Sequence, residues 1–164
     1  MKPTQSLKMR AIGLLSRREH SRVELRRKLQ RIQRSNLAKV DASAEAETDA
    51  EASAELDPLL DWLLAQGYLS DARFVESRVH VRAPRYGSLR IKQELAQHGL
   101  SLSAEAMAEL KAQEFERAKA IWQRKFGGEW PSDAAVRAKQ MRFLIMRGFA
   151  PELVHRLLRC ADET

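Results

Sequence analysis

Gln66-Gly67-Tyr68-Leu69-Ser70 is the first of three similar stretches that decide the fold of this chain; the others are His98-Gly99-Leu100-Ser101 and Arg147-Gly148-Phe149-Ala150. Each stretch joins a helix end to a glycine, an apolar residue and a small residue. A glycine just after a helix adopts the left-handed conformation at little cost, and the apolar residue beyond it packs back on the last turn. The three stretches therefore predict a helical unit that recurs along the chain.

The second and third stretches extend into a longer match. At a constant offset of 49 residues, Ile91, Leu95, Gly99 and Leu100 correspond to Gln140, Leu144, Gly148 and Phe149. A small helical unit buries too little surface alone, so tandem units stack on their neighbours and form long surfaces. Such a stack has a radius of gyration clearly above the roughly 15 Å of a compact globule of this length. The repeat predicts a protein that binds something extended.

Composition agrees with an all-α protein. The chain has 164 residues, of which 44% are hydrophobic and 6% aromatic, with 7 glycines and 5 prolines. Alanine, leucine, arginine and glutamate dominate, and these residues favour helix. We expect three units of three helices over residues 1–69, 70–112 and 113–164, with an acidic, disordered insertion at about 35–56 in the first unit.

Several helix boundaries have local signals. Ser21 and Glu24 form a capping box, and Asp57-Pro58 is a predicted helix entry, with Asp57 as the N-cap and Pro58 in the first turn. Ser101 or Ser103, and Ser132 or Asp133, start two later helices. The expected inward residues include Val81 and Leu89, and the carboxylates are expected on polar faces.

The charge is strongly basic. The net charge of +7 includes seven acidic residues within 41–57, and without them 29 basic residues oppose 15 acidic ones. Residues 1–36 alone carry 11 Lys and Arg and 2 acidic residues. Most such side chains belong to solvated helix surfaces, but an excess of this size favours a polyanionic partner, either nucleic acid or an acidic protein surface.

No pattern indicates catalysis. The only cysteine is Cys160, the four histidines are scattered, and Gly127-Gly128 is not followed by the Lys-Ser/Thr of a phosphate-binding loop. There is no signal-peptide core and no run of about 20 apolar residues. We expect a soluble, cytoplasmic, monomeric protein that is not an enzyme and needs no cofactor or metal.

Basic side chains gather at three places, which we take as the candidate sites for a partner or DNA. They are either solvated surface or, once the units stack, a basic strip for phosphates or acidic side chains. Tyr86 either stacks on a base or packs at its turn. The candidates are Arg17, Arg18, Arg22, Arg26 and Arg27; Arg85, Tyr86, Arg90 and Lys92, which follow Arg82; and Arg137, Lys139, Arg142 and Arg147.

Three ordered blocks resemble the RecX family, bacterial regulators of the RecA recombinase. They are Arg17-Arg18-Glu19-His20-Ser21-Arg22-Val23-Glu24-Leu25-Arg26-Arg27-Lys28-Leu29, then Gly67-Tyr68-Leu69-Ser70-Asp71-Ala72-Arg73-Phe74, and Tyr86-Gly87-Ser88-Leu89-Arg90-Ile91-Lys92-Gln93-Glu94-Leu95 with Gly99-Leu100-Ser101. The similarity spans nearly the whole chain except residues 35–56. Ala83-Pro84 departs from the basic or glycine-containing run that is usual there, which predicts a stiffer joint.

The resemblance implies an elongated, curved array of three three-helix repeats. It also implies binding in the groove of the RecA–single-stranded-DNA filament, inhibition of its ATPase, recombinase and strand-exchange activities, and some direct affinity for DNA. The competing hypothesis is a stand-alone helical nucleic-acid-binding protein, which the turn at residues 17–22 permits although no single recognition helix is marked. An enzyme acting on nucleic acid ranks third.

Overall fold

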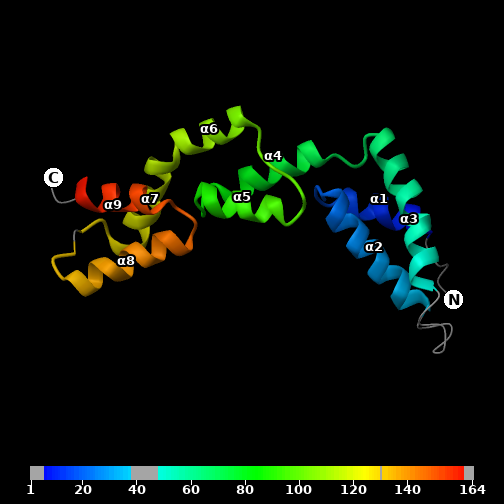
Figure 1. Ribbon diagram of the computed structural model, residues 1–164, viewed down its shortest axis with the longest axis horizontal. Helices are drawn as coiled ribbons and strands as arrows, with labels where there is room; N and C mark the ends of the chain where they lie inside the picture. The colour runs from blue at the N-terminus through cyan, green and yellow to red at the C-terminus, as the bar shows by residue number, and fades with distance from the viewer. Residues whose placement is uncertain (1–5, 38–47, 130, 161–164) are drawn as a thin grey trace. The chain divides into compact units, whose positions relative to one another are not determined.

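In the computed structural model, residues 6–37, 48–129 and 131–160 are described, and within these ranges the chain forms nine α-helices and no strand. The expected all-α class is confirmed. The helices follow one another along the chain (Figure 1): α1 (Leu7–Leu15), α2 (Arg22–Leu37), α3 (Thr48–Ala65), α4 (Asp71–Arg82), α5 (Ser88–Ala96), α6 (Ala104–Ala112), α7 (Glu114–Phe126), α8 (Ala134–Met146) and α9 (Pro151–Cys160).

The chain divides into two compact units, Met1–Phe74 and Val75–Thr164, which we call unit 1 and unit 2. The boundary falls inside α4, after its first turn. The finer division into three repeats over 1–69, 70–112 and 113–164, and their arrangement in a curved array, stay predictions.

The hydrophobic core of unit 1 consists mainly of leucine side chains. In it α2 packs along α3 and α1 packs against α2. Leu25 and Leu29 are one turn apart on α2 and have no exposed surface, so they form one buried stripe of this helix. The remaining fully buried residues of this core are Ala11, Leu56, Leu60, Leu63 and Leu69.

The core of unit 2 lies where α7, α8 and α9 meet. Helix α9 has a one-sided apolar face that contributes Val154, Leu157 and Leu158. Trp122 of α7 is buried, and its indole Nε1–H donates to the buried Gln140 Oε1 of α8 at 2.7 Å. Gln140 and Ile91, which the repeat pairs with each other, are both buried.

The glycine anchors behave as predicted. Gly67, Gly99 and Gly148 have φ values of 73°, 70° and 85°. After the second and third anchors the apolar residue donates its N–H back into the helix, from Leu100 to Leu95 O at 3.0 Å and from Phe149 to Leu144 O at 3.3 Å. This is the bond that closes a helix with a left-handed glycine. In the first anchor the residue that turns inward is Leu69, whereas Tyr68 is exposed.

Side chains cap three helices at positions that the sequence indicates, and for α2 the observed bond is the Ser21 half of the predicted capping box. Ser21 Oγ accepts from Glu24 N at 3.0 Å. Of the alternatives that the sequence leaves open, Ser103 caps α6 and Asp133 caps α8.

The predicted helix entry at Asp57-Pro58 is wrong, because α3 begins at Thr48 and Pro58 lies inside it. The preceding residues are mostly Ala and Glu, which favour helix, and Leu56 is fully buried in the core of unit 1. Burial of Leu56 offsets the hydrogen bond that proline cannot donate. Residues 35–37 are also helical, so the predicted insertion at 35–56 is too wide; its residues 38–47 lie outside the described part of the chain.

Three predictions of burial are also wrong. Val81 and Leu89 are 61% and 49% exposed, because neither lies on the inward stripe of its helix, which in α5 is Ile91 and Leu95. Glu114 was expected on a polar face, but it is buried, with 3% of its surface exposed. It acts as a cap for another helix, described below.

Candidate functional site

Three guanidinium groups surround one tyrosine ring in unit 2. The Cζ atoms of Arg90, Arg82 and Arg147 lie 4.8, 5.3 and 5.8 Å from the centre of the Tyr86 ring. Arg147 also lies 4.6 Å from the ring of Phe143. Cations are attracted to aromatic faces at these distances. We call Arg82, Tyr86, Arg90 and Arg147 the Tyr86 cluster.

Two glycines bring the members of this cluster together from distant parts of the chain. Gly87 N donates to Arg147 O at 2.8 Å, and Leu89 N donates to Gly148 O at 3.1 Å. A Cβ atom on Gly87 would lie 2.2 Å from Gly148 O, and one on Gly148 would lie 2.3 Å from Arg90 Cβ. The start of α5 and the end of α8 therefore touch through backbone that only glycine permits.

Side-chain bonds support the same contact. Arg147 Nη1 donates to Arg85 O at 3.0 Å, and Arg90 Nη1 approaches Met146 O at 3.4 Å. Each arginine thus reaches across the contact to the backbone of the other segment.

A buried carboxylate and a half-buried guanidinium hold the turn that carries Tyr86. Glu114 accepts from Ser88 N at 2.7 Å and from Ser88 Oγ at 2.9 Å, so it caps α5, whose own N-cap is Gly87. Arg117 donates to Ala83 O and Leu110 O, both at 2.8 Å. Burial lowers the pKa of Arg117, and the neighbouring charge of Glu114 opposes that shift. These contacts fix the turn against α7.

The Tyr86 cluster keeps an excess of positive charge. Its only ion-pair partner among the described residues is Glu94, which lies 2.9 Å from Arg82 and 3.5 Å from Arg90. Three guanidinium groups thus share one carboxylate. Beside them is a polar cavity of about 380 Å³ that Arg82 and Arg90 help to line, together with Arg78, Gln93, Glu94, Gln97 and His98.

In unit 1 the predicted basic residues mostly face carboxylates. Arg22 Nη1 lies 2.7 Å from Asp61 Oδ1, and Arg26 Nη1 lies 2.8 Å from Asp57 Oδ1. Arg18 forms a two-pronged ion pair with Glu24. Only two of the five predicted contacts here, Arg17 and Arg27, are exposed without an ion pair to a described residue.

Unit 1 also holds a buried histidine. His20 is 2% exposed, its Nδ1 lies 2.9 Å from Arg18 O, and its Nε2 lies 2.9 Å from Lys28 Nζ. Burial lowers the pKa of His20, and the nearby cations Arg18 and Lys28 add to this effect. Burial by itself raises the pKa of Glu24, but the hydrogen bond from Arg18 and the surrounding positive charge lower it below its ordinary value.

The remaining predicted residues lie outside the Tyr86 cluster. Arg85 and Lys92 are exposed on either side of it, and Lys139 and Arg142 are exposed on α8. Arg137 lies partly buried near the start of α8, 3.5 Å from Pro131 O. About 15 Å of helix separates Arg137 from Arg147. Only Arg147 of this third group joins residues of the second.

Sequence reasoning missed Arg82, Glu94, Glu114 and Arg117. Arg82 stands at the head of the basic run that was noticed, so the signal was available. Glu114 contacts Ser88, 26 positions away, and Arg117 contacts Ala83, 34 positions away, and the sequence holds no local signal for either contact.

The geometry of the Tyr86 cluster can bind an anion. Guanidinium groups bind phosphate or carboxylate through paired N–H donors, and a partly exposed aromatic ring beside them can stack on a base. Within the described residues no group of His, Cys, Asp and Glu is placed to hold a metal ion. Among the described helices none is long and apolar enough to cross a membrane.

The comparisons with known proteins agree with the helical fold. The family models of the second and third three-helix domains of RecX match residues 70–104 and 112–158. A "Regulatory protein RecX" of Ralstonia nicotianae is 48% identical, with 96% of this chain and 89% of the relative covered. The corresponding proteins of Leptothrix cholodnii and Herbaspirillum seropedicae are 42% and 44% identical, over 98% and 99% of this chain and 92% and 93% of theirs. The chain therefore belongs to the RecX family.

Proposed function

We propose that this protein is a non-catalytic regulator that binds the filament formed by the RecA recombinase on single-stranded DNA and inhibits its ATPase, recombinase and strand-exchange activities. It acts in the cytoplasm, as a monomer and without a cofactor. The resemblance to the RecX family supplies the partner. The Tyr86 cluster is the observation that carries the proposal, because it offers positive charge that one carboxylate cannot balance.

Binding at this cluster would slow ATP turnover in the filament by bridging neighbouring recombinase protomers. A rigid basic surface that contacts neighbouring recombinase protomers, or the phosphates between them, opposes the rearrangements that accompany ATP turnover. The Gly87–Gly148 contact supports this role, since it holds Arg90 and Arg147 on one rigid framework rather than on separate loops. A guanidinium that is already positioned loses less entropy when it binds.

The test is the DNA-dependent ATPase of a purified RecA-type recombinase on single-stranded DNA, titrated with this protein. Arg85→Gln/Arg90→Gln/Lys92→Gln removes three exposed charges at and beside the cluster. The matched control Lys111→Gln/Lys119→Gln/Arg124→Gln removes three exposed charges from α6 and α7. We expect substoichiometric suppression by the unaltered protein and by the control, and weaker suppression by the first variant.

Lack of suppression by the unaltered protein would contradict the proposal. If the protein then bound bare single-stranded DNA with strong salt dependence, it would be a stand-alone nucleic-acid-binding protein. If the two triple variants lost the same amount of ATPase suppression, the suppression would depend on overall charge and not on the Tyr86 cluster.

A further inference from the structure

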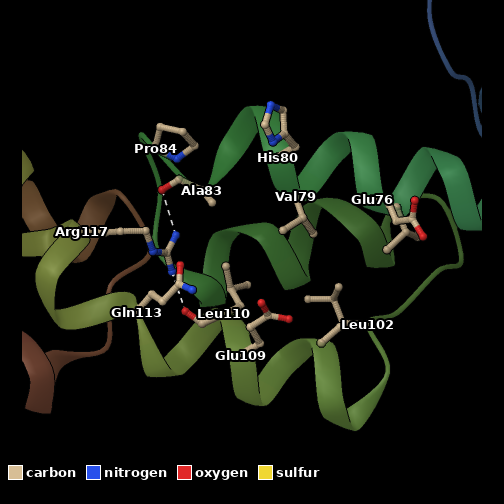
Figure 2. A pocket seen from close by; sticks show the side chains of 12 residues that line it. Glu76, Val79, His80, Ala83, Pro84, Leu102, Glu109, Leu110, Gln113 and Arg117 are labelled. Atoms are coloured by element: carbon tan, nitrogen blue, oxygen red, sulfur yellow. Dashed lines mark hydrogen bonds between the residues drawn. The ribbon is translucent and has the colours of Figure 1, made fainter.

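Unit 2 has a second cavity, with a chemistry opposite to that of the Tyr86 cluster. It is a groove of about 710 Å³ between α4 and α6, and it shares no lining residue with the polar cavity beside Arg82. Figure 2 shows Val79 of α4 and Leu110 of α6 facing the space between these two helices, with Leu102 at the end away from Arg117. The walls are mostly apolar side chains.

The apolar walls follow helical spacing on both sides. Val75 and Val79 lie one turn apart on α4, and Ala106 and Leu110 lie one turn apart on α6. From Val75 to Pro84 the α4 wall extends about 14 Å, which equals two to three turns of a helix. The groove has the size and the pattern of surfaces that accept the apolar face of an amphipathic helix.

Two carboxylates border the groove, one from each wall. Glu76 and Glu109 are exposed, line the groove, and form no ion pair or hydrogen bond with a residue that the structure describes. Arg117, at the other end, is engaged with the carbonyl oxygens of Ala83 and Leu110 (Figure 2). With Glu76, Glu109 and Arg117 counted together, the lining therefore keeps a formal charge of −1, and of these three groups only the two carboxylates lack a bonded partner among the described residues.

This net negative lining contrasts with the chain's net charge of +7. Carboxylates repel nucleic-acid phosphates and anionic lipid headgroups, so neither is a suitable occupant. They attract Lys and Arg, and apolar walls attract apolar side chains. We propose that the α4–α6 groove binds a basic amphipathic helix of a partner protein, with apolar residues spaced i, i+4 in the groove and cations facing Glu76 and Glu109.

The proposal is independent of the regulatory function proposed above. The test uses a synthetic 14-residue helix-forming peptide with Leu at i, i+4 and i+7 and Lys at the flanking positions. Two matched peptides replace either every Lys with Glu or every Leu with Ser. Fluorescence anisotropy measures affinity for the full-length protein, and methyl NMR of Val75, Val79 and Leu110 locates the bound peptide.

Two variants alter the groove and one serves as a control. Glu76→Lys/Glu109→Lys reverses the rim charge, and Ala106→Trp fills the groove. Glu116→Lys/Glu152→Lys makes the same charge change at exposed positions that do not line it. We expect the Leu/Lys peptide to bind at least about tenfold more weakly to the rim variant, since loss of two ion pairs plus repulsion amounts to about 1.4 kcal/mol. Ala106→Trp should weaken binding at least as much, because its ring occupies the space of the peptide's leucines. The control should bind within about twofold.

Three results would overturn the proposal: no binding of the Leu/Lys peptide, equal binding of either matched peptide, or equal weakening in the rim variant and its control. Shifts confined to methyl groups outside the groove would assign the peptide to another site. Because the rim variant changes only exposed side chains, it keeps the test valid even where Ala106→Trp disturbs packing.

Discussion

Units 1 and 2 are both rich in arginine, but they use it differently. In unit 1, Arg22 and Arg26 face the carboxylates of Asp61 and Asp57, which neutralise them. In unit 2, Arg90 and Arg147 reach backbone carbonyl oxygens and an aromatic ring, which orient a cation without cancelling its charge. The one carboxylate near Arg90, that of Glu94, is shared with Arg82. The number of basic residues in a segment therefore says little about how much positive potential it presents; the partner that orients each guanidinium decides this.

The largest expected effect comes from breaking the contact between Gly87 and Gly148, which holds the Tyr86 cluster of unit 2 together. Gly87→Ala places a methyl group 2.2 Å from Gly148 O and should lower the free energy of unfolding of unit 2 by about 3 kcal/mol. Chemical denaturation followed by tryptophan fluorescence, in a Trp62→Phe background that removes the signal of unit 1, measures this. Gly99→Ala is the control: its Cβ meets nothing within 4 Å, so only the strain of its positive φ, about 1 kcal/mol, should appear. Equal costs at both positions would contradict the close contact.

The next prediction compares the two units directly. Arg90→Gln/Arg147→Gln should weaken binding to single-stranded DNA about tenfold and reduce the salt dependence by about one unit per arginine, because the Tyr86 cluster carries more positive charge than Glu94 balances. Arg22→Gln/Arg26→Gln removes the same formal charge from unit 1 and should change the affinity much less. Fluorescence anisotropy at several salt concentrations measures both. A larger loss in the unit 1 variant would reverse the comparison.

The stability of unit 1 should depend on pH because of His20. Burial lowers the pKa of His20 below its ordinary 6.5, so the unfolded chain takes up a proton at a higher pH than the folded protein does. Stability should therefore fall as the pH drops below about 6.5. Thermal unfolding of the full chain between pH 7 and pH 5 should show this loss, and His20→Gln should reduce it.

Glu24 does not interfere in that window. Its pKa is lowered from 4.5, so its contribution is present above about pH 4.5 and is lost only as the pH falls further. An unchanged pH dependence in His20→Gln would show that another group causes the loss.

The smallest expected effect comes from a substitution that leaves an arginine of unit 1 without its carboxylate, as in the Tyr86 cluster of unit 2. Asp57→Asn removes the carboxylate that faces Arg26, in a pair whose side chains are 35% and 45% exposed. Exposed ion pairs contribute about 0.2–1 kcal/mol, so unit 1 should lose at most that much stability. The uncovered positive charge should raise affinity for single-stranded DNA about twofold. Lower DNA affinity in this variant would mean that the Asp57–Arg26 pair positions Arg26 for binding instead of masking it.

Prediction from the sequence succeeded where the determinant is local. Gly99 and Gly148 end helices with positive φ, and Ser21 caps α2, because each signal involves residues within one helical turn. It failed at Asp57-Pro58, where a local signal for a helix start was overridden, because α3 already begins at Thr48 and buries Leu56. Propensity is weak compared with packing of a whole side chain.

The sequence predicted which kinds of residue form the candidate site, but not which of the basic residues belong to it. Tyr86, Arg90 and Arg147 were all singled out, yet so were Arg22 and Arg26, which face carboxylates that the sequence analysis did not connect to them. Asp57 and Asp61 are 31 and 39 residues from their partners, so only the packing of α2 on α3 brings them together.

The sequence by itself determined that the chain is helical, where most of its helices begin and end, and which family it belongs to, because these depend on residue type and short-range order. The tertiary structure decided which cations remain available. Arg147 reaches the carbonyl of Arg85 across 62 residues of chain, and it does so because two glycines allow the end of α8 to touch the start of α5. Close approach of backbones is a property of packed elements, so no local pattern encodes it.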